Sequence, residues 1–457
     1  MNTLITLSAA GIVAMIGSVM KSRSWVLPFS IAALIIAGWF AAIEWNQNMI
    51  LFGAMRMDNF AIAFSVVCFI TATFVLIFDH QLNYAKNEHY TEVHAIVLFS
   101  LTGVLVMVSF TSLLMLFLGV EILSLSLYVL AGLHKRDLLS NESALKYFLM
   151  GSFSTGFLLF GIAMLYGATG SFMVSDIAYY LGLHKAQPEP FVVAGIIMLM
   201  IGLLFKVAVA PFHFWTPDVY QGAPTMVTGY MATAGKVAAF AALLRLFQFG
   251  LSPAAASYQS LISAVALLTM FIGNISALYQ KGIKRMLAYS SIAHAGYLLL
   301  ALLTAHDITN GTVLFYSIAY SLASLTAFTV VAILQSHKAA DDVSAFNGLL
   351  KQNPLLALTF AIAMFSLAGI PPAAGFFAKF YIFSAAIREG WTWIVVIAVV
   401  NSFISVYYYF RPMIAAFMMK GHETSYTLSI GTQVLLVVLA VLTILIGILP
   451  GMLTALI

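Results

Sequence analysis

The chain has little charge and almost no cysteine, and each scarcity excludes a class of protein. Only 8% of its 457 residues are Asp, Glu, Lys or Arg, whereas soluble domains carry about 25%. This low fraction, beside 62% hydrophobic residues and a mean hydropathy of +1.02, excludes a soluble globular domain. Cys68 is the single cysteine and lies in an apolar run, which excludes an internal disulfide and any multi-cysteine metal or iron–sulfur site.

Motifs that carry enzymatic chemistry are also missing. The sequence contains no GxxxxGK[ST] phosphate loop, no HExxH, no CxxC and no GxSxG nucleophile elbow. The net charge of +4 is small and gives no reason to expect a nucleic-acid partner. The first twenty residues are apolar without a basic leader or a small-residue cleavage site, so we expect a retained first span. We expect no cofactor or metal site in this chain.

Long apolar runs fill most of the sequence. About 20 apolar residues in a helix cross a bilayer core of about 30 Å, so these runs predict an all-α integral membrane protein that occupies residues 1–457 as one polytopic domain. We expect fourteen spans, with the least distinct boundary near Ser109 to Ser112. The expected spans are 2–20, 24–43, 57–78, 93–110, 111–133, 144–168, 191–222, 225–247, 257–279, 286–304, 311–335, 354–387, 391–415 and 427–452.

Alternation of these spans divides the loop cations unevenly between the two sides. An excess of Lys and Arg marks the cytoplasmic side, so both termini are predicted on the outer side. Twelve cations fall on the cytoplasmic side: Lys21, Arg23, Lys86, Lys135, Arg136, Lys281, Lys284, Arg285, Lys338, Lys351, Arg411 and Lys420. Four fall on the other: Arg56, Lys185, Arg245 and Arg388.

Two expected spans, 191–222 and 354–387, are too long for one crossing and too short for two. Each contains prolines near its middle, and proline breaks a helix by removing a backbone donor and clashing with the preceding turn. These prolines are Pro211 and Pro217 in the first and Pro371 and Pro372 in the second. Broken spans at corresponding places in two halves indicate inverted repeats around an ion site. Because the seventh and twelfth spans are five apart, we expect five-helix repeats over spans 4–8 and 9–13.

These repeats divide the domain into four parts. The expected parts are three N-terminal spans (1–92), a first repeat (93–250), a second repeat (251–420) and a C-terminal span (421–457).

Five ionisable residues lie inside the apolar runs: Glu121, Lys146, Lys206, Lys236 and Lys379. A charge at the centre of a bilayer costs about 2.5 to 3.5 kcal/mol on insertion scales, so such residues face a polar interior and mark an ion pathway. They are our candidate proton-transfer residues.

Glu121 is the carboxylate placed deepest in a span, and we pair it with a lysine. Lys206 lies five residues before Pro211, where broken backbone admits water. Burial and a movable carboxylate shift a lysine's proton affinity in opposite directions, so this pair could take up and release protons. The structural alternatives are that Ser124 or Ser126 satisfies Glu121 or that the ion pair is only structural.

The other lysines each have a second interpretation. Small residues surround Lys236, so it could donate to carbonyls of a closely packed helix instead of relaying protons. Lys379 follows its helix break instead of preceding it, yet lies near mid-membrane. Lys146 is about a turn inside its span; it could extend to the surface or pair with Glu142 four residues earlier.

Two histidines could connect the lysines, since histidine titrates near neutral pH. They are His213, beside the first break, and His294; the alternative is that each is a satisfied polar residue without a transport role. Hydroxyl side chains that could line a hydrated path, or simply hold helices together, are Tyr289, Ser290, Ser291, Ser317, Tyr320, Ser321, Ser324 and Thr326.

The stretch GLLFKVAVAPFHFWTPDVYQGAPTMVTGYMATAGKVA closely resembles the N subunits of proton-translocating NADH:quinone oxidoreductase, bacterial respiratory complex I. Three further stretches resemble the same family: GVEILSLSLYVLAGLHKRDLLSNESALKYFLMGSFSTGFLLFG, KRMLAYSSIAHAGYLL and FSLAGIPPAAGFFAKFY. The resemblance covers most of spans 5 to 12. It implies an antiporter-like subunit with two inverted five-helix repeats, each holding a half-channel.

By motif position, Glu121, Lys206, Lys236 and Lys379 match the family's proton-transfer residues, and His213 and His294 match positions that connect them through water. The resemblance implies that NADH, FMN, iron–sulfur clusters and quinone are bound by partner subunits. It implies M-type, K-type and J-type membrane partners in a bacterial inner membrane. The competing interpretations are a subunit of a cation/proton antiporter or of a related membrane-bound hydrogenase complex, and a scaffold that conducts no protons.

Overall fold

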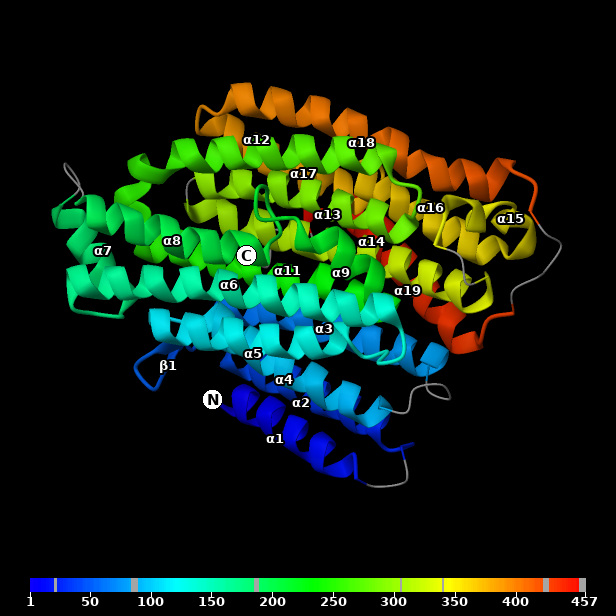
Figure 1. Ribbon diagram of the computed structural model, residues 1–457, viewed down its shortest axis with the longest axis horizontal. Helices are drawn as coiled ribbons and strands as arrows, with labels where there is room; N and C mark the ends of the chain where they lie inside the picture. The colour runs from blue at the N-terminus through cyan, green and yellow to red at the C-terminus, as the bar shows by residue number, and fades with distance from the viewer. Residues whose placement is uncertain are drawn as a thin grey trace.

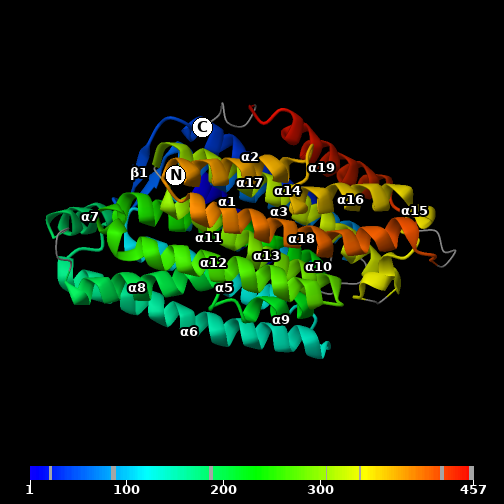
Figure 2. The same cartoon turned by 90° about the horizontal axis from the view of Figure 1, so that it is seen from above.

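The computed structural model describes residues 1–19, 23–83, 89–184, 189–304, 306–338, 341–421 and 427–451. Most helices lie side by side along the long axis of the molecule, as Figures 1 and 2 show from two directions. Within the described ranges, eleven helices are long and apolar enough to cross a membrane, and three shorter apolar helices accompany them. These helices coincide with the fourteen expected spans, so the predicted all-α membrane fold is confirmed.

The first half of the chain supplies eight of these spans. Its elements are α1 (Asn2–Gly17), α2 (Val26–Glu44), α3 (Asn59–Asn83), α4 (Tyr90–Ser109), α5 (Leu113–Ala131), α6 (Leu138–Thr169), α8 (Pro190–Lys206) with α9 (Trp215–Gly222), and a continuous run of α10 (Thr225–Tyr230), η1 (Met231–Gly235), α11 (Lys236–Arg245) and η2 (Leu246–Gly250).

The second half supplies the remaining six. Its elements are η3 (Ser252–Ala254), α12 (Ala255–Tyr279), α13 (Ile283–Leu299), η4 (Leu300–Leu303), α14 (His306–Lys338), η5 (Val343–Phe346), α15 (Leu349–Gln352), α16 (Pro354–Ala368), α17 (Ala374–Arg388), α18 (Thr392–Met418) and α19 (Ile430–Ile448).

A β-hairpin and a short amphipathic helix are among the elements that the apolar runs did not predict. The strands β1 (Met49–Leu51) and β2 (Met55–Met57) form an antiparallel hairpin between α2 and α3. The short helix α7 (Val174–Leu183) buries Val174, Ile177 and Leu181, a helical spacing that gives it one apolar face. Met55 bridges to Phe110 between α4 and α5, which confirms the predicted boundary there.

The seventh span is broken, as predicted, between α8 and α9. The helix α8 ends at Lys206, and Ala208, two residues further on, has a positive φ of 61° that a continuing helix cannot adopt. The freed backbone finds partners outside the span, because Thr269 Oγ1 on α12 accepts from the Ala210 N–H at 3.0 Å. Pro217 was predicted to contribute to the break and does not, because it lies in the first turn of α9, where the missing N–H costs no hydrogen bond.

The twelfth span is broken, as predicted, between α16 and α17. Gly369 caps α16 with a φ of 82°, and Pro371 and Pro372 follow. Gly375 passes so close to α16 that a Cβ there would lie 1.8 Å from the Ser366 carbonyl oxygen. Its N–H donates to Ser366 Oγ at 3.1 Å. The two halves of this span are therefore joined by a tight contact as well as by the chain.

The first helix, α1, begins and the last helix, α19, ends at the same end of the bundle (Figures 1 and 2). The Met1 ammonium pairs with Glu44 at 2.7 Å, just before the hairpin that precedes α3. The first turn of α19 contacts the far end of α3, where Thr432 donates to Gln81. The helix α19 therefore runs back toward the end of the bundle that carries β1, where α1 begins (Figures 1 and 2). An even number of spans requires this arrangement.

Two cations assigned to loops from the sequence are buried instead. Arg245 is 3% exposed and its guanidinium lies 2.5 Å from Asp58 Oδ1 at the start of α3. Lys284 is 4% exposed and donates to the Gln221 and Ala223 carbonyls at the end of α9. Nearby, burial raises the pKa of the Asp341 carboxyl, and the Lys284 cation opposes that rise. These cations tie separate segments together, so the sequence count of loop charges overstated the exposed ones.

Candidate functional site

Four of the five predicted proton-transfer residues, Glu121, Lys206, Lys236 and Lys379, come from four different spans, whereas the fifth, Lys146, has a side chain that is 40% exposed. Lys206 is the last residue of α8, Lys236 the first of α11, and Lys379 lies in the second turn of α17. Lys236 and Lys379 are buried, and His294 on α13 is 5% exposed. The two broken helices therefore place Lys206 and Lys379 where backbone carbonyls and hydroxyls are available as partners.

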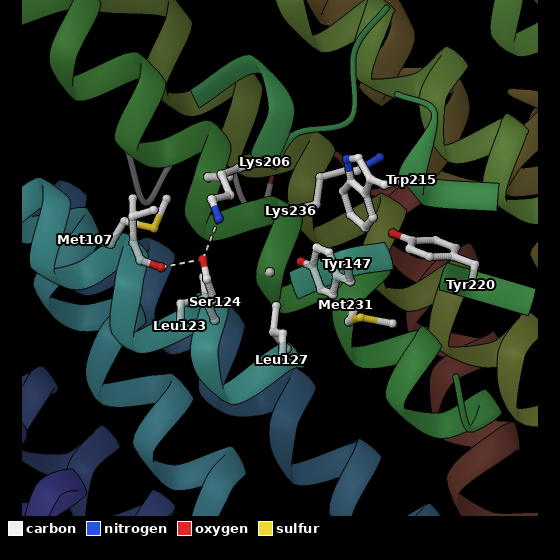
Figure 3. Close-up of a pocket in the computed structure, with 13 residues that line it drawn as sticks. Met107, Leu123, Ser124, Leu127, Tyr147, Lys206, Trp215, Tyr220, Met231 and Lys236 are labelled. Carbon is white, nitrogen blue, oxygen red and sulfur yellow. Dashed lines mark hydrogen bonds between the residues drawn. The ribbon is translucent and has the colours of Figure 1, made fainter. Parts of the chain in front are cut away.

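Glu121 and Lys206 form no direct ion pair in this structure, and the movable pair remains a prediction. Lys206 Nζ donates to Ser124 Oγ at 2.7 Å (Figure 3) and to the Tyr128 hydroxyl at 3.1 Å. Ser124 and Tyr128 lie one and two turns beyond Glu121 along α5. Glu121 Oε1 is buried without a hydrogen-bond partner. Ser124 and Ser126 donate to backbone carbonyls of their own helix, so neither hydroxyl satisfies the carboxylate.

Lys206 and Lys236 share one small cavity. Its volume is about 20 Å³, and it is lined by both lysines together with Ser124, Tyr147 and Tyr220 (Figure 3). About 10 to 15 Å³ of such space holds one water molecule when polar partners surround it. The cavity therefore has room for one water molecule, and both lysines line it.

Lys236 follows a π-helical turn, η1, which displaces the helix just before the lysine. Cys68 of α3 supports this turn, since its thiol donates to the Ala234 carbonyl at 3.6 Å. The Lys236 ammonium donates to the Ser291 carbonyl at 2.6 Å and also to the Ser291 hydroxyl. The contact to a neighbouring carbonyl is the one expected for a purely structural lysine, so it does not by itself assign a transport role.

The helix α13 carries polar residues at helical spacing between Lys236 and Lys379. Ser291, His294 and Tyr297 follow one another at intervals of three residues. His294 Nδ1 lies 2.5 Å from the Tyr316 hydroxyl and its Nε2 lies 3.1 Å from the Tyr409 hydroxyl. The histidine is thus held on both nitrogens at the centre of the second half.

Lys379 lies beyond this histidine. Its ammonium donates to the Ala368 carbonyl at the end of α16 and to Ser402 Oγ, each at 2.9 Å. The Tyr297 ring faces it, with the centroid 5.2 Å from Nζ. The α16 break therefore supplies an acceptor for Lys379, as the α8 break gives Lys206 room to turn toward α5.

Lys146 and His213 lie outside this set of contacts. Lys146 pairs with Glu142 at 2.6 Å, as one of the alternatives predicted, and also with Asp218 at 2.6 Å. His213 is 5% exposed in the segment between α8 and α9, and its Nδ1 is buried without a partner. The geometry thus leaves His213 with a free nitrogen and gives Lys146 two carboxylates.

Several residues of the site were missed or undervalued by sequence reasoning. They are Tyr128, Tyr297, Tyr316, Ser402 and Tyr409. The available signal was the occurrence of tyrosines inside apolar runs, where a hydroxyl requires a partner. Tyrosine also packs as an aromatic residue, so only contacts distinguish the two uses.

The described residues include no group of three or more His, Cys, Asp or Glu side chains that could hold a metal ion. The expectation that this chain carries no cofactor remains a prediction.

Comparison with known proteins shows the family to which this chain is related. A family described as NADH:quinone oxidoreductase/Mrp antiporter, transmembrane, matches residues 110–405. NADH-quinone oxidoreductase subunit N of Flavobacterium psychrophilum is 39% identical over 452 residues, which cover 99% of each chain. The chain belongs to this family. The subunit N of Trichlorobacter lovleyi is also 39% identical and covers 94% of this chain and 90% of its own. The resemblance inferred from the sequence motifs is confirmed.

Solved structures share the architecture. A chain of respiratory complex I from Thermus thermophilus with bound aureothin superposes with a TM-score of 0.86 at 34% identity, covering 99% of this chain and 98% of that one. A chain of the Mrp complex from a Dietzia species gives a TM-score of 0.87 at 19% identity, covering 100% and 95%. The second likeness shows the fold alone.

Proposed function

We propose that this chain is an antiporter-like subunit in the membrane arm of respiratory complex I and that it moves protons outward. The enzyme activity belongs to the whole complex, in which NADH oxidation and quinone reduction take place in other subunits. The observation that carries the proposal is the line of contacts from Lys206 through the shared cavity to Lys236 and Ser291, and on through α13 to Lys379. Such a line of ionisable groups at membrane depth is typical of a proton relay.

In this proposal the side chains of this chain accept and release the protons that cross the membrane. Glu121, Lys206, Lys236 and Lys379 are the proposed proton-transfer residues, with Lys146, His213 and His294 in secondary roles. The Glu121 carboxylate moves toward or away from Lys206 when neighbouring subunits of the complex change conformation. While the carboxylate is away, Ser124 and Tyr128 accept hydrogen bonds from the Lys206 ammonium. The four parts 1–92, 93–250, 251–420 and 421–457 then correspond to an N-terminal flank, two half-channels and a closing helix.

Partners and location follow from the same proposal. M-type, K-type and J-type membrane subunits adjoin the chain; NADH, FMN, iron–sulfur clusters and quinone are bound elsewhere in the complex. The chain lies in a bacterial inner membrane with both termini outside. The positive-inside bias of the loops supports that orientation.

The second candidate is a subunit of a cation/proton antiporter, which the likeness to the Mrp complex chain favours at the level of fold. Identity of 39% to subunit N along nearly the whole chain supports the complex I assignment over it. The related membrane-bound hydrogenase alternative differs in the redox reaction that the partner subunits carry out.

The test is proton pumping in the assembled complex. Lys206→Ala, Lys236→Ala and Lys379→Ala are compared with Lys351→Ala, which removes an exposed lysine on α15. We expect NADH-driven proton uptake into inverted vesicles to fall about tenfold or more in the three interior variants, a loss that corresponds to about 1.4 kcal/mol. Equal pumping in all four variants, at equal subunit content, would contradict the proposal.

A further inference from the structure

The His294 ring is held by more contacts than a bridging role between the lysines requires. Both ring nitrogens contact tyrosine hydroxyls, at 2.5 Å for Tyr316 on α14 and 3.1 Å for Tyr409 on α18. All three side chains are buried in the second half of the bundle. A buried imidazole held in this way cannot rotate to exchange its two nitrogens without breaking both contacts.

The Tyr409 hydroxyl decides which nitrogen carries the hydrogen. It donates to Ser290 Oγ at 2.7 Å. A tyrosine hydroxyl has one hydrogen, so toward His294 Nε2 the same oxygen can only accept. Neutral His294 therefore carries its hydrogen on Nε2 and leaves Nδ1 as the acceptor for the Tyr316 hydroxyl.

We propose that Tyr316, His294, Tyr409 and Ser290 form an oriented hydrogen-bonded relay, in which Tyr409 is the positioning residue that fixes the tautomer of His294. Every donor in the relay points the same way, from Tyr316 to Ser290. This inference rests on the proposed function, and it adds a direction and two tyrosine hydroxyls to the path between the lysines.

The charges of both buried lysines, Lys379 and Lys236, act on His294 at the centre of the relay. Ser290 adjoins Ser291, which accepts from Lys236. The Tyr316 end opens on a cavity of about 10 Å³, lined also by Ser366 and Ala378 at the α16 break, one residue from Lys379. His294 therefore places the relay between Lys379 and Lys236.

A single transfer along the relay moves one proton and leaves the number of protons on the four residues unchanged. A proton arriving at the Tyr316 oxygen releases the Tyr316 hydroxyl proton to Nδ1, and the Nε2 proton passes to the Tyr409 oxygen. Tyr409 gives its own proton to Ser290, which releases its hydroxyl proton toward the Lys236 side. One proton enters and one leaves, and His294 ends as the other tautomer. The relay must reverse before it carries a second proton in the same direction.

Tyr409→Phe tests the positioning role, since it removes the hydroxyl and keeps the ring. The matched control is Tyr258→Phe, which removes a hydroxyl from a buried tyrosine on α12 outside the relay. In the assembled complex we expect Tyr409→Phe to slow proton pumping several-fold and to change its pH profile, because His294 then exchanges tautomers. The charged and titratable side chains around His294 that shape this profile are Lys236, Tyr297, Tyr316, Tyr320, Lys379 and Tyr409.

A double-mutant cycle separates the relay from a packing effect. Ser290→Ala frees Tyr409 to donate to Nε2, so we expect it to slow pumping as well and the double variant to be no slower than Tyr409→Phe alone. Additive losses, or a Tyr409→Phe complex that pumps like Tyr258→Phe with the same pH profile, would overturn the relay. If the relay variants behave normally while Lys236→Ala is defective, only the relay fails; if Lys236→Ala also pumps normally, the proposed function fails with it.

Discussion

Lys146 Nζ on α6 lies 2.6 Å from Asp218 Oδ2 on α9, and the other oxygen of the same carboxylate accepts from Arg285 on α13 at 2.7 Å. One side chain of the broken seventh span thus holds two spans from different halves of the bundle. This shared carboxylate gives Lys146 a structural partner that its position in the sequence did not indicate.

Asp218→Asn should loosen this junction without stopping transport. Because both cations are partly exposed, water screens the pairs, and we expect a loss of about 1 kcal/mol in stability. Thermal denaturation of the assembled complex measures it, and the loss should shrink at high salt. The control is Glu142→Gln, which breaks only the pair within α6; an equal loss there would show that Asp218 does not join the halves.

Arg245 and Asp58 predict a larger effect, because this ion pair is buried. Arg245→Leu leaves the Asp58 carboxylate without its cation, and removing one partner of a buried pair costs about 3 to 5 kcal/mol. We expect little assembled complex from the single variant. Adding Asp58→Asn should restore most of the assembly, as judged by native gel electrophoresis of membranes. A double variant no better than the single one would mean that Arg245 stabilises the fold through its ring contacts to Phe60 and Phe249.

Glu121→Gln tests the buried carboxylate that lacks a partner. The substitution keeps the shape and removes the charge, so stability should be unchanged or slightly higher. Proton pumping should fall several-fold if the carboxylate modulates Lys206, whereas Glu142→Gln should pump normally. The measurement is proton uptake into inverted vesicles at matched complex content. Normal pumping by Glu121→Gln would show that the lysines transfer protons without this carboxylate.

Gly375→Ala tests the contact across the α16 break. A Cβ there would meet the Ser366 carbonyl oxygen at 1.8 Å, so the break must open and displace Lys379. We expect a several-fold drop in assembled complex and in pumping per complex. Gly156→Ala on α6 is the control, because its Cβ meets nothing within 4 Å. Equal behaviour of the two variants would show that the break tolerates movement.

The sequence by itself determined the fold class, the number of spans and the two breaks, and it predicted lysines at membrane depth. Each follows from a local property: the apolar length that crosses a bilayer, the donor that proline lacks, and the cost of a charge in hydrocarbon. The family resemblance also rests on contiguous motifs, and the comparisons confirm it. Pro217 was misread because its effect depends on where a helix begins.

Only the tertiary structure decided which side chains are hydrogen-bond or ion-pair partners. Lys206 bonds to Ser124 and Tyr128 instead of Glu121, and Arg245 is buried against Asp58 instead of facing a loop. Tyr409 reaches His294 across 115 residues of chain. Hydroxyls and charges inside a membrane protein find partners on other helices, and those partners depend on how the helices pack side by side, which no local pattern encodes.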